Sequence, residues 1–176
     1  PLDLAGTNHG TLQGGLSYTN GKASAAFNCV NNGYLSVPDA SELNFGANQD
    51  FTVAAWVNPQ EITIGHYNCM VSKDDGATGS GWAFALVPPA HTIQLVLVTN
   101  SQAALWAGST SAPPVGAWTH VAAVREGSTV TVFVNGLAET TISAPSVALG
   151  NTAPLLVGAW YDSRFNPPIQ AGEGAK

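Results

Sequence analysis

The stretch from Gln49 to Pro59 constrains the fold more than any other part of the chain, because it is largely apolar on both faces of an extended strand. Side chains of a β-strand alternate between its two faces with a period of two residues. One alternating set is Phe51, Val53, Ala55 and Val57, and the other is Thr52, Ala54, Trp56 and Asn58. The pattern predicts a strand in the middle of a layered β protein, which Pro59 ends.

Short segments of the same kind follow along the whole chain, separated by Gly, Pro and Asn. None predicts a helix long enough to cover a sheet, although residues 41–44 could form one helical turn. Asn135-Gly136 is the strongest hairpin signal. We therefore predict about a dozen strands in an all-β, two-sheet antiparallel β-sandwich, as one domain over residues 1–176. Besides the first stretch, the predicted strands are 16–18, 25–29, 34–37, 68–72, 82–87, 92–100, 103–107, 118–125, 129–134, 137–143 and 155–159.

The surface is expected to be polar but carry few charges. Charged residues make up 9% of the chain and its net charge is −6, whereas about 25% of the residues are charged in typical soluble domains. The five Lys and Arg residues are scattered, so they cannot form the basic stripe that nucleic acid requires. We therefore expect no nucleic-acid partner.

The chain also lacks an apolar run of about 18 residues, so no membrane span is predicted. Its first residue, Pro1, is not an initiator methionine, and no signal pattern follows. We interpret the chain as an excised domain or a processed product.

Cys29 and Cys69 are the only cysteines. An even count in a chain of extracellular-looking composition favours a disulfide between them and an oxidising compartment. The alternative is two buried free thiols, since cysteine is among the residue types most often buried.

The segment Phe51 to Pro59, FTVAAWVNP, resembles the strand FTxxAWVxP of laminin G-like jelly-roll domains, in the concanavalin A-like lectin and glucanase group. The segment 3–10, DLAGTNHG, is similar to the opening loop DxSGNxNHG of that family. Further matches in the family's order are VSK at 71–73, WTHVA at 118–122, VFVNG at 132–136 and LLVGA at 155–159. The resemblance covers nearly the whole chain and implies a jelly-roll fold, but one fold can carry many functions.

The carboxyl-terminal part departs from the family pattern. Laminin G-like domains usually have a further strand resembling FxGxIDEVRIYxRAL, whereas this chain has FNPPIQ at 165–170 followed by 171–176. Its two prolines cannot donate hydrogen bonds to a sheet. We therefore expect the final family strand to be missing or replaced, and the resulting open edge to favour a dimer or a protein partner.

Catalysis has little support in the sequence. The glucanases of the superfamily carry an ExDxE pattern, which is absent here, and the adjacent pair Asp74-Asp75 would point to opposite faces of a strand. No histidine lies in a known catalytic motif, and His120 matches a family position where packing is expected.

A calcium ion is the metal that the resemblance implies, because related domains often hold one beside the opening loop. By that resemblance Asp3 and Asn8 would bind it, together with backbone carbonyl groups near Gly6 and His9. The alternative is a turn in which the Asp and Asn side chains bond to local backbone groups.

Carbohydrate binding needs aromatic rings that stack on sugar rings, with amides or charges that bind hydroxyl groups. Trp160, Tyr161 and Arg164 form the most suggestive cluster, since exposed adjacent aromatic residues indicate a binding surface. For Trp82, Trp106 and the Trp160-Tyr161 pair, packing in the core is the alternative, and Trp56 and Trp118 are assigned to packing. The candidate carbohydrate-binding residues are Asn31, Asn32, Lys73, Trp82, Asn100 (with Gln102), Trp106, Trp160, Tyr161 and Arg164.

We therefore expect a non-catalytic, lectin-like carbohydrate-binding module of a larger secreted or surface protein. A structural or adhesive module that binds protein is the first alternative, and a polysaccharide-degrading enzyme is the second.

Overall fold

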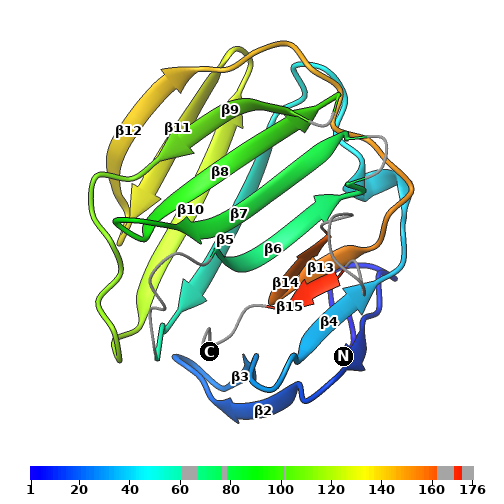
Figure 1. Ribbon diagram of the computed structural model, residues 1–176, viewed down its shortest axis with the longest axis vertical. Helices are drawn as coiled ribbons and strands as arrows, with labels where there is room; N and C mark the ends of the chain where they lie inside the picture. Colours follow the sequence, from blue (N-terminus) through cyan, green and yellow to red (C-terminus); the bar gives the residue numbers. More distant parts are fainter. Residues whose placement is uncertain (61–66, 77–78, 101, 162–168, 172–176) are drawn as a thin grey trace.

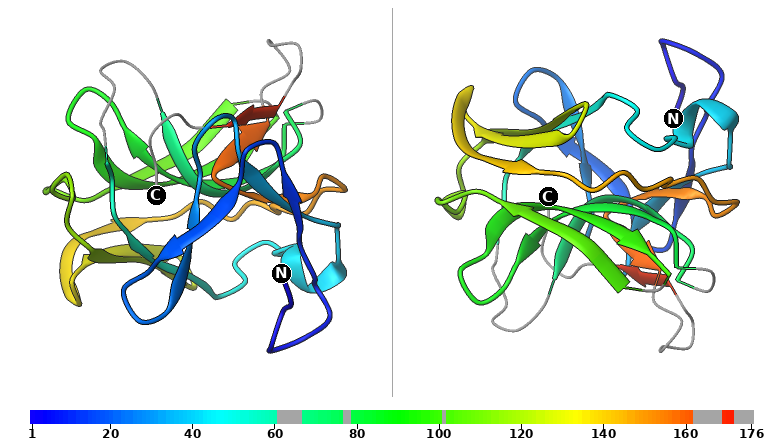
Figure 2. Two further views of the ribbon diagram at one scale, coloured as in Figure 1. Left: turned by 90° about the horizontal axis from the view of Figure 1, so that it is seen from below. Right: turned by 90° about the horizontal axis from the view of Figure 1, so that it is seen from above.

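The computed structural model describes residues 1–60, 67–76, 79–100, 102–161 and 169–171. In this part of the chain, a seven-stranded and a four-stranded antiparallel sheet stack as two layers of a sandwich (Figures 1 and 2). The predicted all-β jelly-roll fold is thus confirmed. None of the described residues forms a helix long and apolar enough to cross a membrane.

The larger sheet has the strand order β1-β4-β13-β6-β7-β8-β9 and the smaller one the order β12-β11-β10-β5. Two pairs, β2-β3 and β14-β15, form separate two-stranded sheets. The strands are β1 Thr11–Gln13, β2 Ser17–Asn20, β3 Ala25–Asn28, β4 Tyr34–Val37, β5 Phe51–Val57, β6 Asn68–Asp74, β7 Gly81–Val87, β8 Thr92–Thr99, β9 Gln102–Gly108, β10 Thr119–Glu126, β11 Thr129–Val134, β12 Leu137–Ser143, β13 Leu155–Val157, β14 Ala159–Tyr161 and β15 Ile169–Ala171.

Alternating apolar side chains of the two sheets make the core. On β8, Ile93, Leu95 and Leu97 are fully buried between the layers, and Val130 and Val132 of β11 face them from the smaller sheet. The predicted Asn135-Gly136 turn connects β11 to β12, and both residues have the positive φ values, 50° and 80°, that the favoured hairpin turns require.

The first stretch of the sequence forms β5, but not in the position predicted for it. Among the described residues, β5 pairs only with β10 and ends the four-stranded order. Phe51 and Val57 are buried, whereas Trp56 on the other face is 46% exposed. Hence the prediction that this stretch forms a strand in the middle of the layered protein was wrong. The strand that is buried along its whole length is β7.

The sequence pattern missed three strands, β1, β14 and β15, which lie near the two ends of the chain. β1 was expected to be loop, but it pairs with β4. The predicted strand 155–159 is divided at Gly158, where φ is 82°, into β13 and the first residue of β14. β15 lies where no family strand was recognised, and it pairs with β14 rather than with β1. In the described part of the chain, β1 therefore remains at an edge of the larger sheet.

A buried lysine ties three loops to the larger sheet. Lys73 is fully buried, and its ammonium group lies 2.8 Å from the Asp39 carboxylate. The same Nζ donates to the carbonyl oxygens of Asn151 and Ala153, both at 3.0 Å. The Asn151 amide in turn donates to the carbonyl oxygens of Lys73 and Ser80. Because Nζ has at least as many acceptors as hydrogens, this buried charge is well compensated.

A second polar junction fixes the loop after β9 against β12. The Glu139 carboxylate accepts hydrogen bonds from the backbone N–H groups and hydroxyl groups of Thr110 and Ser111. The Ser111 hydroxyl, followed by the other donors, lowers the pKa of Glu139. The junction joins the end of one sheet to the edge of the other.

Replacement of Lys73 by Met should lower the free energy of unfolding by about 3 kcal/mol, because the acceptors around Nζ lose their donor. The matched variant Lys22→Met, at an exposed lysine, should cost less than about 1 kcal/mol. Urea denaturation monitored by fluorescence measures both. Equal losses in the two variants would contradict the structural role of Lys73.

The same variant should show a defined pH dependence. The hydrogen bond from Lys73 lowers the pKa of Asp39, so the ion pair stabilises the fold above the ordinary Asp pKa and is lost as the pH falls through the lowered value. The stability difference between wild type and Lys73→Met should therefore shrink in acid.

Candidate functional site

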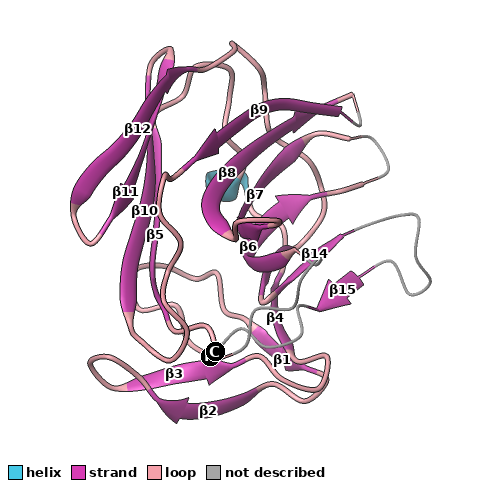
Figure 3. Ribbon diagram, turned by 60° about the vertical axis from the view of Figure 1, so that its left-hand side comes forward, coloured by secondary structure: helices cyan, strands magenta, loops and turns pink. Residues whose placement is uncertain are grey.

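Three aromatic side chains, Tyr67, Trp106 and Trp160, form a row on the face of the larger sheet that points away from the core. We call them the aromatic row. The ring centroids of Tyr67 and Trp160 lie 5.1 Å apart and those of Tyr67 and Trp106 lie 6.3 Å apart. Tyr67 is 37% exposed and Trp106 is 44% exposed. The three residues come from the segment before β6, from β9 and from β14, which are distant in the sequence (Figure 3).

Small side chains on the outer face of β7 explain why a tryptophan can pack there. On β7, Ala83, Ala85 and Val87 point away from the core, and Trp160 packs against them together with Cys69. β14 is held beside β6 by the Ser72 hydroxyl, which donates to the carbonyl oxygen of Ala159 at 2.9 Å. The backbone N–H of Gly158 donates to the Met70 carbonyl oxygen at 2.9 Å. Trp160 is therefore positioned by the sheet on which it packs.

An uncharged polar group lies next to Trp106 on the same face. Gln94 of β8 pairs with Gly108 of β9, two positions from Trp106. A Cβ atom on Gly108 would lie 3.2 Å from Cγ of Gln94, so glycine leaves room for the amide side chain. The Gln94 amide donates to the Thr92 hydroxyl at 3.2 Å and keeps further donor and acceptor capacity. Aromatic rings beside such an amide can bind a neutral ligand that has both apolar and hydroxyl groups.

Two of the residues predicted to bind carbohydrate, Trp106 and Trp160, thus lie in one row, and the Tyr67 ring contacts both of them. Tyr161 follows Trp160 on β14 and is half-buried. No local sequence signal indicates Tyr67 or Gln94, because only the tertiary fold brings them to the row. One available signal was the alternation of β9, which places Trp106 on the face opposite Leu105 and Ala107.

The predicted asparagines lie in turns away from the row. Asn31 and Asn32 connect β3 to β4 with φ values of 53° and 57°, and both side chains are exposed. Asn100 has a φ of 50° in the β8–β9 turn, and Gln102 begins β9. Asparagine tolerates positive φ better than most residues, so these positions have a conformational explanation.

Two predicted binding residues are instead buried. Lys73 belongs to the junction described above and has no free surface. Trp82 is 3% exposed in the core, where its ring lies 5.8 Å from that of Phe45. Both alternate to the inner face of the sheet, so their placement in a carbohydrate site was wrong. Arg164, the remaining candidate, lies outside the described residues.

The disulfide prediction is also corrected. Cys29 and Cys69 are free, buried thiols. Burial raises the pKa of Cys29 to about 11 and that of Cys69 to about 12. Both thiols therefore stay protonated and uncharged near neutral pH, and they give no information about the redox compartment.

The opening loop has the local hydrogen bonds that were considered as the alternative to calcium. The Asp3 carboxylate accepts from the backbone N–H groups of Ala5 at 2.9 Å and Asn8 at 3.2 Å. These bonds, with Ala5 first, lower the pKa of Asp3. The backbone N–H of Asp3 donates to Nδ1 of His9, and Gly6 packs against the same carboxylate.

One further carboxylate reaches this loop. The Asn8 amide donates to Oε1 of Glu42 at 3.1 Å, a residue that the family pattern did not indicate. Two carboxylates and an amide are thus linked at one loop, and hard oxygen atoms of this kind suit Ca²⁺. The described residues contain no group of three or more His, Cys, Asp or Glu side chains arranged to bind a metal.

The adjacent acidic pair of the sequence lies where β6 ends, with Asp74 as its last residue and Asp75 as the first residue of the loop after it. Oδ1 of Asp74 accepts from the backbone N–H of Gly76 at 3.0 Å, and Oδ1 of Asp75 accepts from that of Gly79 at 2.8 Å. Each carboxylate therefore stabilises a turn of the loop.

Solved structures share this fold across most of the chain. Domain 4 of AbnA, a GH43 extracellular arabinanase from Geobacillus stearothermophilus, in complex with arabinotriose, has a TM-score of 0.66 and 22% identity, over 94% of this chain and 82% of that one. The carbohydrate-binding module CBM66 from Bacillus subtilis has a TM-score of 0.51 and 13% identity, over 84% and 86%. The binding domain of botulinum neurotoxin DC in complex with SialylT has a TM-score of 0.60 and 11% identity, over 88% and 40%.

No curated protein has a sequence that matches this chain. The model of the laminin G-like family, described as the concanavalin A-like lectin/glucanases superfamily, matches residues 30–170. This match spans well over half of the sequence and agrees with the two-sheet fold. The chain therefore belongs to the laminin G-like family of the concanavalin A-like lectin/glucanases superfamily.

Proposed function

We propose that the protein is a non-catalytic carbohydrate-binding module of a larger secreted or surface protein, and that the aromatic row binds the glycan. The observation that carries the proposal is the exposure of Trp106 and Tyr67 in one row with Trp160. Aromatic rings held in place by a sheet offer a flat apolar surface to the C–H groups of a sugar ring.

The surroundings of the row favour a neutral glycan. Val96 and Ala83, which pair beside Trp106 across β8 and β7, are uncharged, and Gln94 offers an amide for hydroxyl groups. The chain carries a net charge of −6, which disfavours polyanionic ligands by long-range repulsion. The similar domain from the arabinanase was solved with arabinotriose, so arabino-oligosaccharides are the first probes to use.

Titration of neutral oligosaccharides into the protein by calorimetry, beginning with arabinotriose, should detect saturable binding. Trp106→Ala should weaken that binding about ten-fold or more, since a central aromatic contact is lost, whereas Trp106→Phe should retain part of it. Leu137→Ala removes an exposed apolar side chain from the smaller sheet and serves as the control.

Two outcomes would contradict this assignment. Equal binding by Trp106→Ala and Leu137→Ala would place the glycan elsewhere. Absence of binding to every neutral glycan would favour the structural or adhesive module, for which the exposed row on the sheet that ends in β9 would serve as a protein-binding surface.

We further propose that a calcium ion binds at the opening loop through Asp3, Asn8 and Glu42. If its affinity is typical of extracellular modules, about 10 mM Ca²⁺ should raise the melting temperature by roughly 3–8 °C relative to chelator. Asp3→Asn should abolish the shift. The absence of a shift in wild type, or an equal shift in the variant, would contradict calcium binding at this loop.

The edge formed by β1 supports a last proposal, that two chains associate there. A short strand with an unpaired edge can add a strand from a second copy. Light scattering should then give twice the mass of one chain at high concentration, and a monomer at all concentrations would contradict it.

A further inference from the structure

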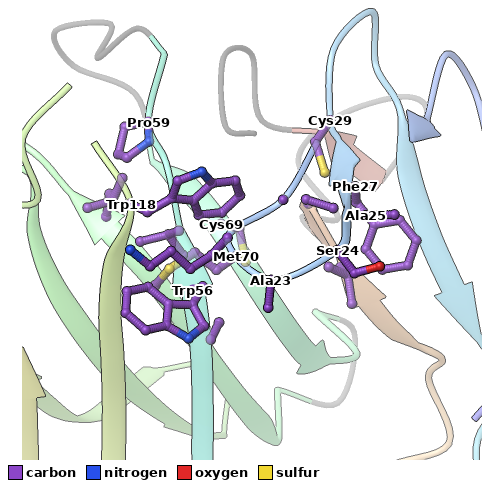
Figure 4. A pocket seen from close by; sticks show the side chains of 18 residues that line it. Ala23, Ser24, Ala25, Phe27, Cys29, Trp56, Pro59, Cys69, Met70 and Trp118 are labelled. Atoms are coloured by element: carbon purple, nitrogen blue, oxygen red, sulfur yellow. The ribbon is translucent and has the colours of Figure 1, made fainter. Parts of the chain in front are cut away.

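A separate cavity of about 370 Å³ lies between the β2–β3 hairpin and one end of the sandwich. Figure 4 shows Ala23, Ser24 and Phe27 of the hairpin on one side and Trp118, Met70 and Trp56 on the other. The volume falls within the range of small-molecule pockets in proteins. The cavity belongs neither to the aromatic row nor to the opening loop.

The mostly apolar walls disfavour a sugar as the natural occupant. Leu86, Val57, Val157 and Met70 contribute apolar side chains, and the two cysteines contribute protonated thiols. Hydroxyl groups buried against such walls would lose hydrogen bonds to water without replacement, which costs about 1–3 kcal/mol for each group. An apolar body, in contrast, would gain from leaving water.

The one charged group in the cavity wall is Lys22. Its Nζ lies 5.1 Å above the centre of the Trp56 ring, and Trp56 is 46% exposed. In the part of the chain that the structure describes, no carboxylate forms an ion pair with Lys22, and Lys73–Asp39 is the ion pair found there. The lining residues include no Asp or Glu. Among the described residues, a positive charge therefore stands without a counter-ion beside an apolar cavity, in a chain with more than twice as many acidic as basic residues.

We propose that this cavity binds an aliphatic monoanion of the fatty-acid class, with the hydrocarbon chain between Trp118 and Phe27 and the carboxylate at Lys22. Trp56 supports the ammonium group through its ring face, so that the charge is placed before the ligand arrives. His120 of β10 pairs with Trp56 of β5, and its ring lies 5.3 Å from the Trp56 ring in an edge arrangement.

Sodium decanoate, below its critical micelle concentration, is the test ligand, and decanol is the uncharged control. Calorimetry with the whole chain should show binding of one decanoate per protein and weaker binding of decanol. Lys22→Met keeps the aliphatic stem but removes the charge, and should weaken decanoate binding about five-fold while leaving decanol unchanged.

A second variant tests the location. Ala23→Trp places a large side chain in the cavity and should abolish binding of both ligands, whereas Ala138→Trp, an equal enlargement on the exposed strand β12, should not.

Three results would overturn the proposal. These are the absence of saturable decanoate binding, equal affinity for decanoate and decanol, and binding that survives in Ala23→Trp. Glycan binding to the aromatic row should be unaffected by decanoate, so the experiments test the two proposed sites independently. Competition between decanoate and a glycan would place both ligands at one site and would also contradict the proposal.

Discussion

The burial of β7 on both faces is the constraint on which the functional surface depends. Its side chains alternate between large residues that point into the core, Trp82, Phe84 and Leu86, and small ones that point outward. An apolar outer face cannot be left in water without a loss of free energy. The chain therefore returns after Gly158 and places Trp160 over Ala83 and Ala85, and the aromatic row is the exposed edge of this covering.

Most of the strands could be predicted from the sequence because alternation and turn residues are local signals, whereas the order of the strands in the two sheets could not. The hairpin at Asn135-Gly136 illustrates this, since both positive φ values follow from the two residue types. The position of the strand 51–57 in its sheet could not be predicted. Small apolar residues such as Ala54 occur on both buried and exposed faces, so they do not show which face is covered. Whether another element covers such a face depends on the tertiary fold.

The candidate site was predicted only in part for the same reason. Trp106 and Trp160 were found because tryptophan is large and rare, but Trp82 has the same residue type and packs in the core. The burial of a charged residue such as Lys73 also cannot be predicted from the local sequence. Its burial depends on oxygen atoms of Asp39, Asn151 and Ala153, which the fold gathers from distant segments. Trp56, assigned to packing from the family pattern, instead supports Lys22 at the cavity.

The two proposed sites differ in the chemistry that each can recognise. The aromatic row is partly exposed and has the Gln94 amide beside it, which suits a ligand that keeps much of its water. The cavity is enclosed by apolar side chains and has a single cation, which suits a ligand that loses its water except at one charged end. Four tryptophans belong to the two proposed sites, with Trp106 and Trp160 at the aromatic row and Trp56 and Trp118 at the cavity.

The indole N–H signals of the five tryptophans, followed by nitrogen-15 NMR during a titration with arabinotriose or another bound neutral glycan, test the central claim most directly. Our account predicts that the signals of Trp106 and Trp160 shift together and saturate, while that of Trp82 in the core stays in place. Shifts confined to Trp56 and Trp118, or saturable glycan binding that moves neither Trp106 nor Trp160, would contradict it.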